Sequence, residues 1–193
     1  MLKSLFARWL LPPLAGALAL TVWGMLFWGV LYEPLRVFDD LTPGVEQAAA
    51  ALETADTQTG TYFMPWPRNT PEAMTAWLGK HRTGPFFKLS YIREGTDPQS
   101  VPKLMRGVGL YVVVAAIAMG LLRLSAHSPE RWLRGSLVVF LAGVMGSVLI
   151  QVGDPVWFHL PWPHALGNLV FQLGAWLLLG AAVALAMRAT SAD

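Results

Sequence analysis

The sequence predicts a mainly α-helical integral membrane protein, with four transmembrane helices and a small α+β extracytoplasmic domain inserted between the first and second helices. Of its 193 residues, 54% are hydrophobic and only 13% are charged, whereas soluble domains carry about 25% charged residues. Four apolar runs each approach the roughly 20 residues that cross the hydrocarbon of a bilayer. The long segment between the first two runs is too polar to lie within lipid.

The first region, residues 1–32, is expected to hold an amphipathic lead-in and the first span. Lys3 and Arg8 stand among large apolar residues, which suits an anionic membrane surface. Pro12 and Pro13 are expected in the first turn of the spanning helix, where no intrahelical N–H bond is lost. A cleaved signal peptide is the competing interpretation. The apolar run is longer than a typical signal core, which favours a retained anchor.

Residues 33–106 are predicted to form the extracytoplasmic domain. Capping residues, apolar spacing and turn residues predict five elements, namely helix 42–56, strand 60–64, a helix opened by Thr70, strand 86–93 and a helix from residue 97. The order helix, strand, helix, strand, helix is typical of a two-stranded unit that helices support.

Charge divides this domain into two halves. Residues 33–56 contain six acids and one base, and residues 57–106 contain seven bases and three acids. The halves are expected to face each other, with isolated surface pairs contributing about 0–1 kcal/mol each, enough to orient the chain more than to stabilise it. The alternative is that the basic half faces anionic lipid headgroups or an acidic partner.

Residues 107–193 are predicted to contain the other three spans, over 107–122, 135–152 and 165–187. The linker 123–134 is net basic, whereas the linker 153–164 contains Asp154 and no Lys or Arg. By the positive-inside rule both termini are cytoplasmic, and the long segment and the second linker are extracytoplasmic. The expected location is a bacterial inner (plasma) membrane.

Small and polar residues within the spans indicate helix–helix contacts. Small residues four positions apart let helix backbones approach closely; these pairs are Ala116 with Gly120, Ala142 with Gly146, Gly143 with Ser147, and Gly180 with Ala184. They serve either to close the bundle or to dock on helices of another protein. Three amides, Gln151, Asn168 and Gln172, are expected to face protein, because an uncompensated amide in hydrocarbon is costly.

Two Pro-Trp-Pro sequences, at 65–67 and 161–163, are expected in the extracytoplasmic loops. Proline fixes the backbone around an amphipathic indole. Such turns either anchor the loops at headgroup level or form a rigid aromatic surface for a protein partner, a lipid or a quinone-like ligand. The candidate surface residues are Tyr62, Trp66, Arg68, Trp157 and Trp162.

Several kinds of chemistry lack support in the sequence. The chain has no cysteine, which excludes disulfides and thiolate metal sites. Four residues are weak candidate metal ligands, but their spacing matches no metal motif, so no metal is predicted and no cofactor is identified; they are His81, Asp154, His159 and His164. No nucleophile or phosphate-loop motif is present. The net charge of +2, without a basic and aromatic stretch, argues against nucleic acid.

The layout of four spans with a long first and a short second outer loop resembles claudin-like and disulfide-oxidase-like bundles in outline. Both families depend on cysteines that this chain lacks, so no residue or activity is transferred.

The expected function is that of a non-catalytic accessory or assembly subunit of a larger membrane complex. Its expected partners are membrane lipids and other membrane subunits or a second copy. The alternatives are a protein that binds lipid or apolar ligands through the Pro-Trp-Pro loops, and a metal-dependent membrane enzyme.

Overall fold

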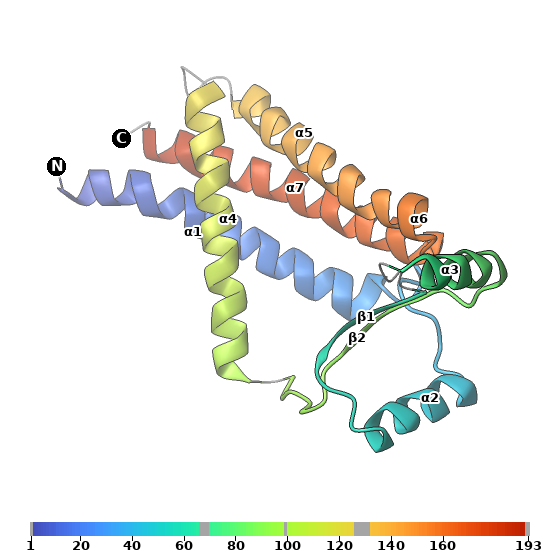
Figure 1. The fold of residues 1–193 in the computed structure, drawn as a ribbon. Coiled ribbons are helices and arrows are strands. Elements are labelled where there is room, and N and C mark those ends of the chain that lie inside the picture. Colours follow the sequence, from blue (N-terminus) through green and yellow to red (C-terminus); the bar gives the residue numbers. More distant parts are fainter. Residues whose placement is uncertain (1, 66–69, 99, 126–131, 192–193) are drawn as a thin grey trace. The chain divides into compact units, whose positions relative to one another are not determined.

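The computed structural model describes residues 2–65, 70–98, 100–125 and 132–191, and it is mostly helical with one small sheet (Figure 1). The chain divides into two compact units. The bundle unit comprises Met1–Phe38, Pro98–Trp157 and Pro161–Asp193. The hairpin unit comprises Asp39–Asp97 together with Phe158–Leu160.

The bundle unit contains the four predicted long helices. Its elements are α1 (Leu2–Leu26), the π-helical turn η1 (Phe27–Leu31), α4 (Val101–Ser125), α5 (Trp132–Gln151), the short α6 (Gly153–Phe158) and α7 (Trp162–Ser191). Four helical stretches are long and apolar enough to cross a membrane, which confirms this part of the sequence prediction. They cover Ala7–Leu31, Val101–Ser125, Trp132–Phe158 and Trp162–Thr190.

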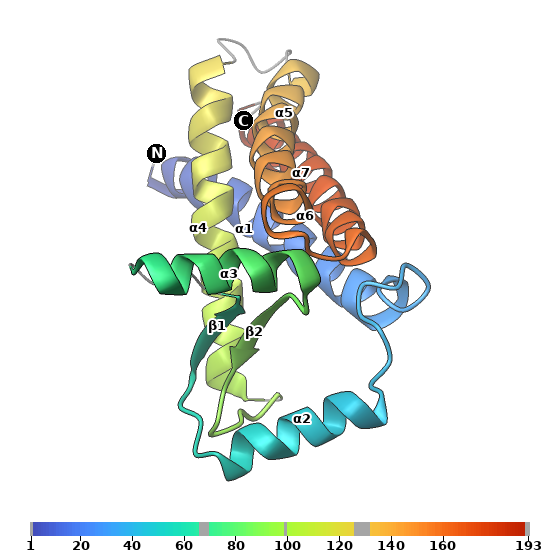
Figure 2. The same ribbon diagram turned by 45° about the vertical axis from the view of Figure 1, so that its right-hand side comes forward.

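Helix α7 is the central helix of the bundle. It packs against α1 on one side and α5 on the other, while α4 crosses α1 (Figures 1 and 2). The core consists of small and branched apolar side chains from all four long helices, namely Leu20, Ala115, Ala118, Met119, Leu122, Val139, Ala175, Leu179, Val183 and Ala184. Leu179 and Val183 of α7 are fully buried. The packing of the other helices therefore depends on α7.

The expected position of the two prolines is wrong. Helix α1 begins at Leu2 and runs through Pro12 and Pro13, which lie in its interior. Pro12 has no N–H to bond the carbonyl four residues earlier, that of Arg8. Arg123 of α4 donates its Nη2 to this carbonyl at 2.9 Å. A hydrogen bond from a neighbouring helix thus replaces the one that proline removes.

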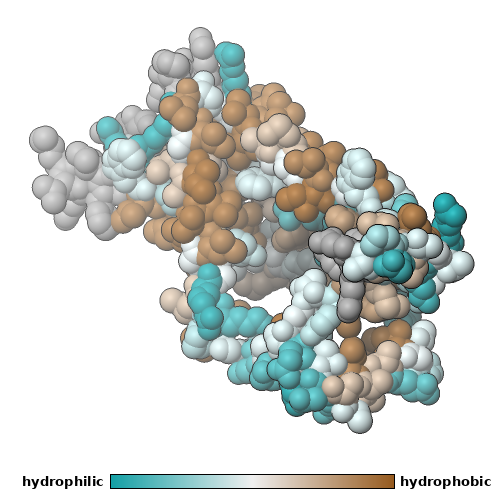
Figure 3. All heavy atoms as spheres, viewed as in Figure 1, coloured by the Kyte–Doolittle hydropathy of each residue, from teal (hydrophilic) through white to brown (hydrophobic). Residues whose placement is uncertain are grey.

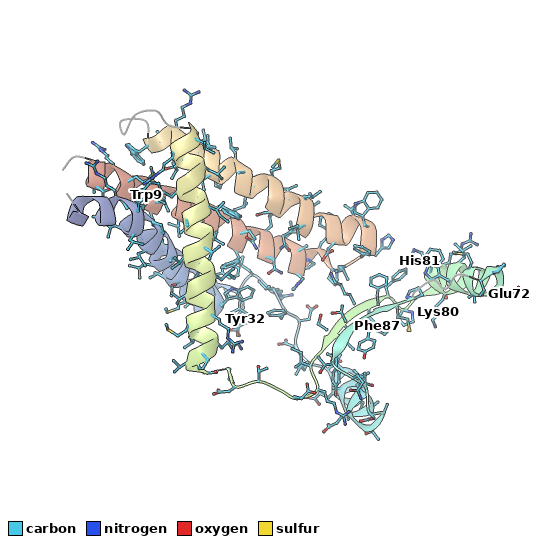
Figure 4. The ribbon with its side chains drawn as sticks, turned by 60° about the vertical axis from the view of Figure 1, so that its left-hand side comes forward. Trp9, Tyr32, Glu72, Lys80, His81 and Phe87 are labelled. Carbon is cyan, nitrogen blue, oxygen red and sulfur yellow. The ribbon has the colours of Figure 1, made fainter. Side chains whose placement is uncertain are left out.

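Basic residues join three helices at one end of the bundle. The guanidinium of Arg123 lies 3.6 Å from the ring centroid of Trp9, a cation–π contact near the start of α1 (Figure 4). Arg8 donates its Nε to the carbonyl of Thr190 at 3.0 Å, in the last turn of α7, where carbonyls lack intrahelical partners. The start of α1 and the ends of α4 and α7 therefore lie together.

Two of the predicted small-residue pairs lie inside the bundle. A Cβ on Gly143 would lie 2.1 Å from Cγ of Trp176, whose Nε1 donates to Ser147 Oγ at 3.1 Å. Ser136 of α5 donates its hydroxyl to the carbonyl of Gly180 in α7 at 3.1 Å. Gly143 and Gly180 therefore allow α5 and α7 to approach closely within the bundle.

The other two pairs are not used in the same way. A Cβ on Gly120 or Gly146 would meet no atom within 4 Å. Their partners Ala116 and Ala142 are exposed. In Figure 3, hydrophobic side chains cover the outward face of α4 along much of its length. These pairs leave small, apolar surface on α4 and α5 that the bundle itself does not fill.

An aromatic cluster surrounds the π-helical turn that extends α1. Phe27 is completely buried and lies 5.0 Å from Phe171 and 5.1 Å from Trp28, measured between ring centroids. Tyr32 donates its backbone N–H to the carbonyl of Phe27, five residues earlier. Such single π turns widen a helix locally and are frequent at functional sites. The sequence did not predict this turn.

The hairpin unit contains two helices and one antiparallel pair of strands. These elements are α2 (Pro43–Thr54), β1 (Gly60–Met64), α3 (Pro71–Thr83) and β2 (Phe87–Tyr91). The register pairs Gly60 with Tyr91 at one end and Met64 with Phe87 at the other. The predicted order of these elements is correct, and β2 is shorter than the predicted strand 86–93.

The second linker is not the loop that the sequence predicts. Helix α6 occupies Gly153–Phe158, and α7 already begins at Trp162. Pro155 lies in the first turn of α6, where its missing N–H removes no intrahelical bond. The turn residues that suggested a loop are therefore compatible with a short helix.

Candidate functional site

One face of the β-hairpin is apolar and incompletely covered. Paired residues of an antiparallel ladder share a face, and successive residues alternate between faces. The register therefore places five apolar side chains together, namely Tyr62, Met64, Phe87, Leu89 and Tyr91. We call this set the apolar hairpin face. None of the five is buried, and the exposed fraction is 37% for Tyr62 and 40% for Phe87.

The hairpin unit has almost no core of its own. Among its described residues, only Pro65 is buried. Helix α2 contains no buried residue, and α3 contains none. A two-stranded hairpin is marginally stable in water without a hydrophobic surface packed against it. The unit therefore exposes apolar side chains that a folded domain of its size normally covers.

A groove is formed by residues of both strands of the hairpin together with Phe158. Its volume is about 520 Å³. It is lined by Thr61, Tyr62, Phe63, Lys88 and Phe158. The rings of Phe63 and Phe158 lie 5.5 Å apart between centroids, in an edge-to-face arrangement. By the same register, Thr61, Phe63 and Lys88 lie on the face opposite the apolar hairpin face, and Tyr62 is the lining residue that belongs to both.

Two of the histidines predicted as weak ligands lie near each other in the hairpin unit. His81, near the end of α3 (Figure 4), has its ring centroid 6.0 Å from that of His159. The rings of Trp77 and Phe86 lie 4.9 Å and 4.5 Å from the ring of His81. In the part of the chain that the structure describes, Nδ1 of His81 is buried and makes no hydrogen bond.

The four candidate ligands do not form one described site. Asp154 and His164 belong to the bundle unit, whereas His81 and His159 belong to the hairpin unit. Within residues 2–65, 70–98, 100–125 and 132–191, no three His, Cys, Asp or Glu residues are grouped so that they could hold a metal ion. Two imidazoles supply half of the four ligands of a tetrahedral zinc site.

His164 instead connects two segments of the bundle unit. Its Nδ1 lies 2.8 Å from the carbonyl of Val37, which can only accept, so Nδ1 carries the proton. Asn168 places its amide nitrogen 3.1 Å from Nε2 of His164 and donates to the His164 carbonyl at 2.9 Å. Val37 is buried against Gly167, where a Cβ would lie 2.5 Å from its Cγ2. These contacts hold the segment after η1 against α7.

A pocket of about 250 Å³ lies between α1, α4 and α7 in the bundle unit. Its walls are mainly apolar and aromatic, formed by Leu20, Leu110, Tyr111, Val114, Phe171, Gln172, Ala175, Trp176 and Leu179. Two of these residues carry hydrogen-bonding groups without a partner, since neither Tyr111 nor Gln172 makes a hydrogen bond to another described residue. An apolar pocket with a few polar groups is the usual form of a small-molecule site.

The remaining predicted residues are distributed between the two units. Trp66 and Arg68 lie outside the described residues, and so does any contact between the two Pro-Trp-Pro turns. Trp157 and Trp162, in the bundle unit, are 76% and 49% exposed. Gln151 ends α5 and does not line the pocket.

Sequence reasoning missed Tyr111 as a candidate functional residue. It lies in an apolar span, where its ring was counted as hydrophobic and its hydroxyl was overlooked. A phenol hydroxyl within a spanning segment needs a partner as an amide does. That requirement is the signal by which the sequence indicates Tyr111 together with Gln172.

A hydrogen-bond network joins the residue before β1 to the residues after β2, at the open end of the hairpin. Thr59 donates its hydroxyl to a carboxylate oxygen of Glu94 at 2.9 Å and accepts the backbone N–H of Arg93 at 3.0 Å. Arg93 also forms an ion pair with Asp56. This pair joins the acidic half to the basic half, as the charge distribution predicts. The Thr59 hydrogen bond lowers the pKa of the exposed Glu94 carboxyl below its ordinary value.

The lowered pKa predicts that acid weakens this end of the hairpin. A carboxyl with a depressed pKa stabilises the folded state above its unfolded pKa, about 4.3 for Glu, and this contribution disappears as the pH falls through the folded value. The protection factor of the Arg93 amide, its exchange rate relative to the intrinsic rate at the same pH, is therefore expected to fall below about pH 4.3. Glu94→Gln is expected to remove this pH dependence. Glu53→Gln, on α2, is the matched control, and an equal effect from it would contradict the assignment.

Comparison of the chain with protein-family models, with curated proteins and with solved structures found no match. The site must therefore be interpreted from its own chemistry.

Proposed function

We propose that this protein is an integral membrane accessory or assembly subunit of a larger membrane complex. In this proposal the four long helices span a bacterial inner membrane, both termini are cytoplasmic, and the hairpin unit lies outside the cytoplasm. The clustering of Arg8 and Arg123 near the end of α7 supports the orientation, because basic residues are concentrated on the cytoplasmic side of membrane proteins.

The observation that carries the proposal is the uncovered apolar hairpin face. Burying a large apolar side chain contributes about 1.5–3 kcal/mol relative to leaving it in water. The hairpin unit forgoes much of this stabilisation, because only Pro65 among its described residues is buried. A second protein that covers this face would supply the missing burial.

The bundle offers a second contact surface for the same kind of partner. The pairs Ala116 with Gly120 and Ala142 with Gly146 are small, and the bundle leaves space beside both glycines. Small residues at this spacing let helices of another membrane protein approach closely. The partner is therefore expected to be a membrane subunit with both spanning helices and an extracytoplasmic apolar surface.

A charge placed on either face of one strand tests this proposal. Phe87→Asp puts a carboxylate on the apolar hairpin face, and Ser90→Asp puts the same group on the opposite face of β2. After mild detergent extraction, the wild type and Ser90→Asp are expected to retain stoichiometric membrane subunits by native mass spectrometry. Phe87→Asp is expected to bind the partner at least about tenfold more weakly, and so to retain clearly less of it, because the lost burial is about 1.5–3 kcal/mol.

The two variants also define the results that would contradict the proposal. Purification of the wild type as a lone monomer under gentle extraction would count against an accessory role. Equal partner loss from both variants would show that added charge, and not the apolar hairpin face, is responsible. Circular dichroism of each variant establishes that the helices remain folded.

A further inference from the structure

The pocket between α1, α4 and α7 has two polar groups beyond the first turns of the spanning helices. Tyr111 lies five residues after Arg106, and Gln172 lies eight residues after His164. With a rise of 1.5 Å per residue, they lie about 8 Å and about 12 Å along their helices from these polar side chains. In a spanning bundle, the hydroxyl and the amide are therefore inside the outer part of the hydrocarbon layer.

These two groups differ from the other polar groups of the bundle. Trp176, which also lines the pocket, donates its Nε1 to Ser147, and Asn168 is bonded to His164. Tyr111 and Gln172 have no such partner among the described residues. Polar groups in an apolar environment are disfavoured unless they are hydrogen-bonded. Both residues line the same pocket, Tyr111 from α4 and Gln172 from α7, which indicates that a ligand supplies the partner.

We propose that this pocket binds a membrane-dissolved quinone, a planar ring with carbonyl groups and an apolar tail. A phenol hydroxyl and an amide nitrogen both donate hydrogen bonds, and a carbonyl oxygen accepts them without adding a donor of its own. The rings of Phe171 and Trp176 provide aromatic walls for a planar ring. A volume of about 250 Å³ is suited to one ring and the start of a tail.

The position of its acceptors distinguishes this ligand from an ordinary membrane lipid. An acyl chain fills apolar space but offers no acceptor to Tyr111 or Gln172. The ester carbonyls of a phospholipid lie at the membrane surface, about 8–12 Å along the helices from these residues. A quinone carries its carbonyl groups on the ring itself, so one molecule supplies an acceptor for both side chains and a planar ring for the aromatic walls.

Binding of decylubiquinone to the full chain in phosphatidylcholine nanodiscs tests the proposal. Empty nanodiscs of the same lipid measure the quinone that dissolves in the bilayer. Discs that contain the wild type are expected to retain quinone in excess of this amount through gel filtration, as measured by the absorbance of extracted quinone. The double variant Tyr111→Phe, Gln172→Leu removes both hydrogen-bonding groups and is expected to bind at least about tenfold more weakly. Gln151→Leu makes the same amide-to-apolar change outside the pocket and is expected to bind normally.

Thermal unfolding without quinone separates a binding role from a structural one. Gln172→Leu removes an unpaired amide from an apolar wall, so the Tm of the quinone-free protein is expected to stay constant or rise. Added decylubiquinone is expected to raise the Tm of the wild type and not of the double variant. Equal quinone binding by the wild type and the double variant, or retention of phospholipid alone by the wild type, would overturn the proposal.

Discussion

A cysteine at residue 48 is expected to react with a membrane-impermeant maleimide in intact spheroplasts, and a cysteine at residue 189 only after the membrane is opened. The protein has no cysteine of its own, so each substitution introduces a single thiol. Ala48 is exposed on α2 of the hairpin unit, and Ala189 is exposed in the last turn of α7. The difference is close to all or none, because the reagent does not cross the bilayer. Gel-shift labelling measures it directly.

The physical reason for this orientation is the distribution of basic residues. Arg8 and Arg123 lie at the same end of the bundle as Thr190, so Ala189 is at the basic end. Positively charged residues flanking spans remain in the cytoplasm. Opened membranes provide the control, since both thiols must then react. Protection of residue 48 with labelling of residue 189 would invert the proposed topology.

Gly143→Ala is expected to destabilise the bundle, whereas Gly146→Ala, three residues further along α5, is expected to stabilise it slightly. A Cβ at residue 143 would lie 2.1 Å from Cγ of Trp176, at the base of a side chain that packs between α5 and α7. Overpacking of this kind costs about 1–3 kcal/mol. At residue 146 the Cβ meets no atom within 4 Å. There the gain in helix propensity is about 0.5–1 kcal/mol.

Thermal unfolding of the purified protein in one detergent compares the two variants. Both make the same chemical change in the same helix, so an opposite sign of the Tm shift isolates the effect of packing. Equal shifts would contradict the described contact between Gly143 and Trp176. Under the proposed function, Gly146→Ala has a further effect. The variant is expected to be stable as a monomer but to retain a partner helix more weakly, because the added methyl group occupies the surface on which that helix packs.

Those parts of the fold that depend on local sequence were predicted well. Strand β1 occupies the predicted Gly60–Met64, because alternating side chains end at a proline that cannot continue the ladder. Thr70 caps α3 as expected, its hydroxyl accepting the N–H of Ala73 at 3.2 Å. Four apolar runs of spanning length became four long helices. In each case neighbours in the chain determine the structure.

Features that depend on distant residues could not be predicted in this way. Pro12 is tolerated inside α1 because Arg123, more than one hundred residues later, donates to the carbonyl that proline leaves free. The buried position of Val37 depends on Gly167 of α7. The sequence identifies the residues of such contacts but not the pairs.

The same distinction between local and long-range features applies to the candidate site. Gln172 was singled out because an amide in a span requires a partner, and it lines the bundle pocket. The pocket itself arises from the crossing of α1, α4 and α7, so its aromatic walls were not predictable from any one helix. In the hairpin unit, the approach of His81 to His159 brings together residues that lie far apart in the sequence. Long-range geometry, and not residue type, was the missing information.

The central position of α7 has a consequence for biogenesis. Under the proposed function, α1, α4 and α5 enter the membrane before the helix that supplies Leu179 and Val183 to the core. Until α7 arrives, the surface of α5 around Gly143 lacks the indole that fills it in the complete bundle. In that case, insertion of the first three long helices precedes assembly of the core.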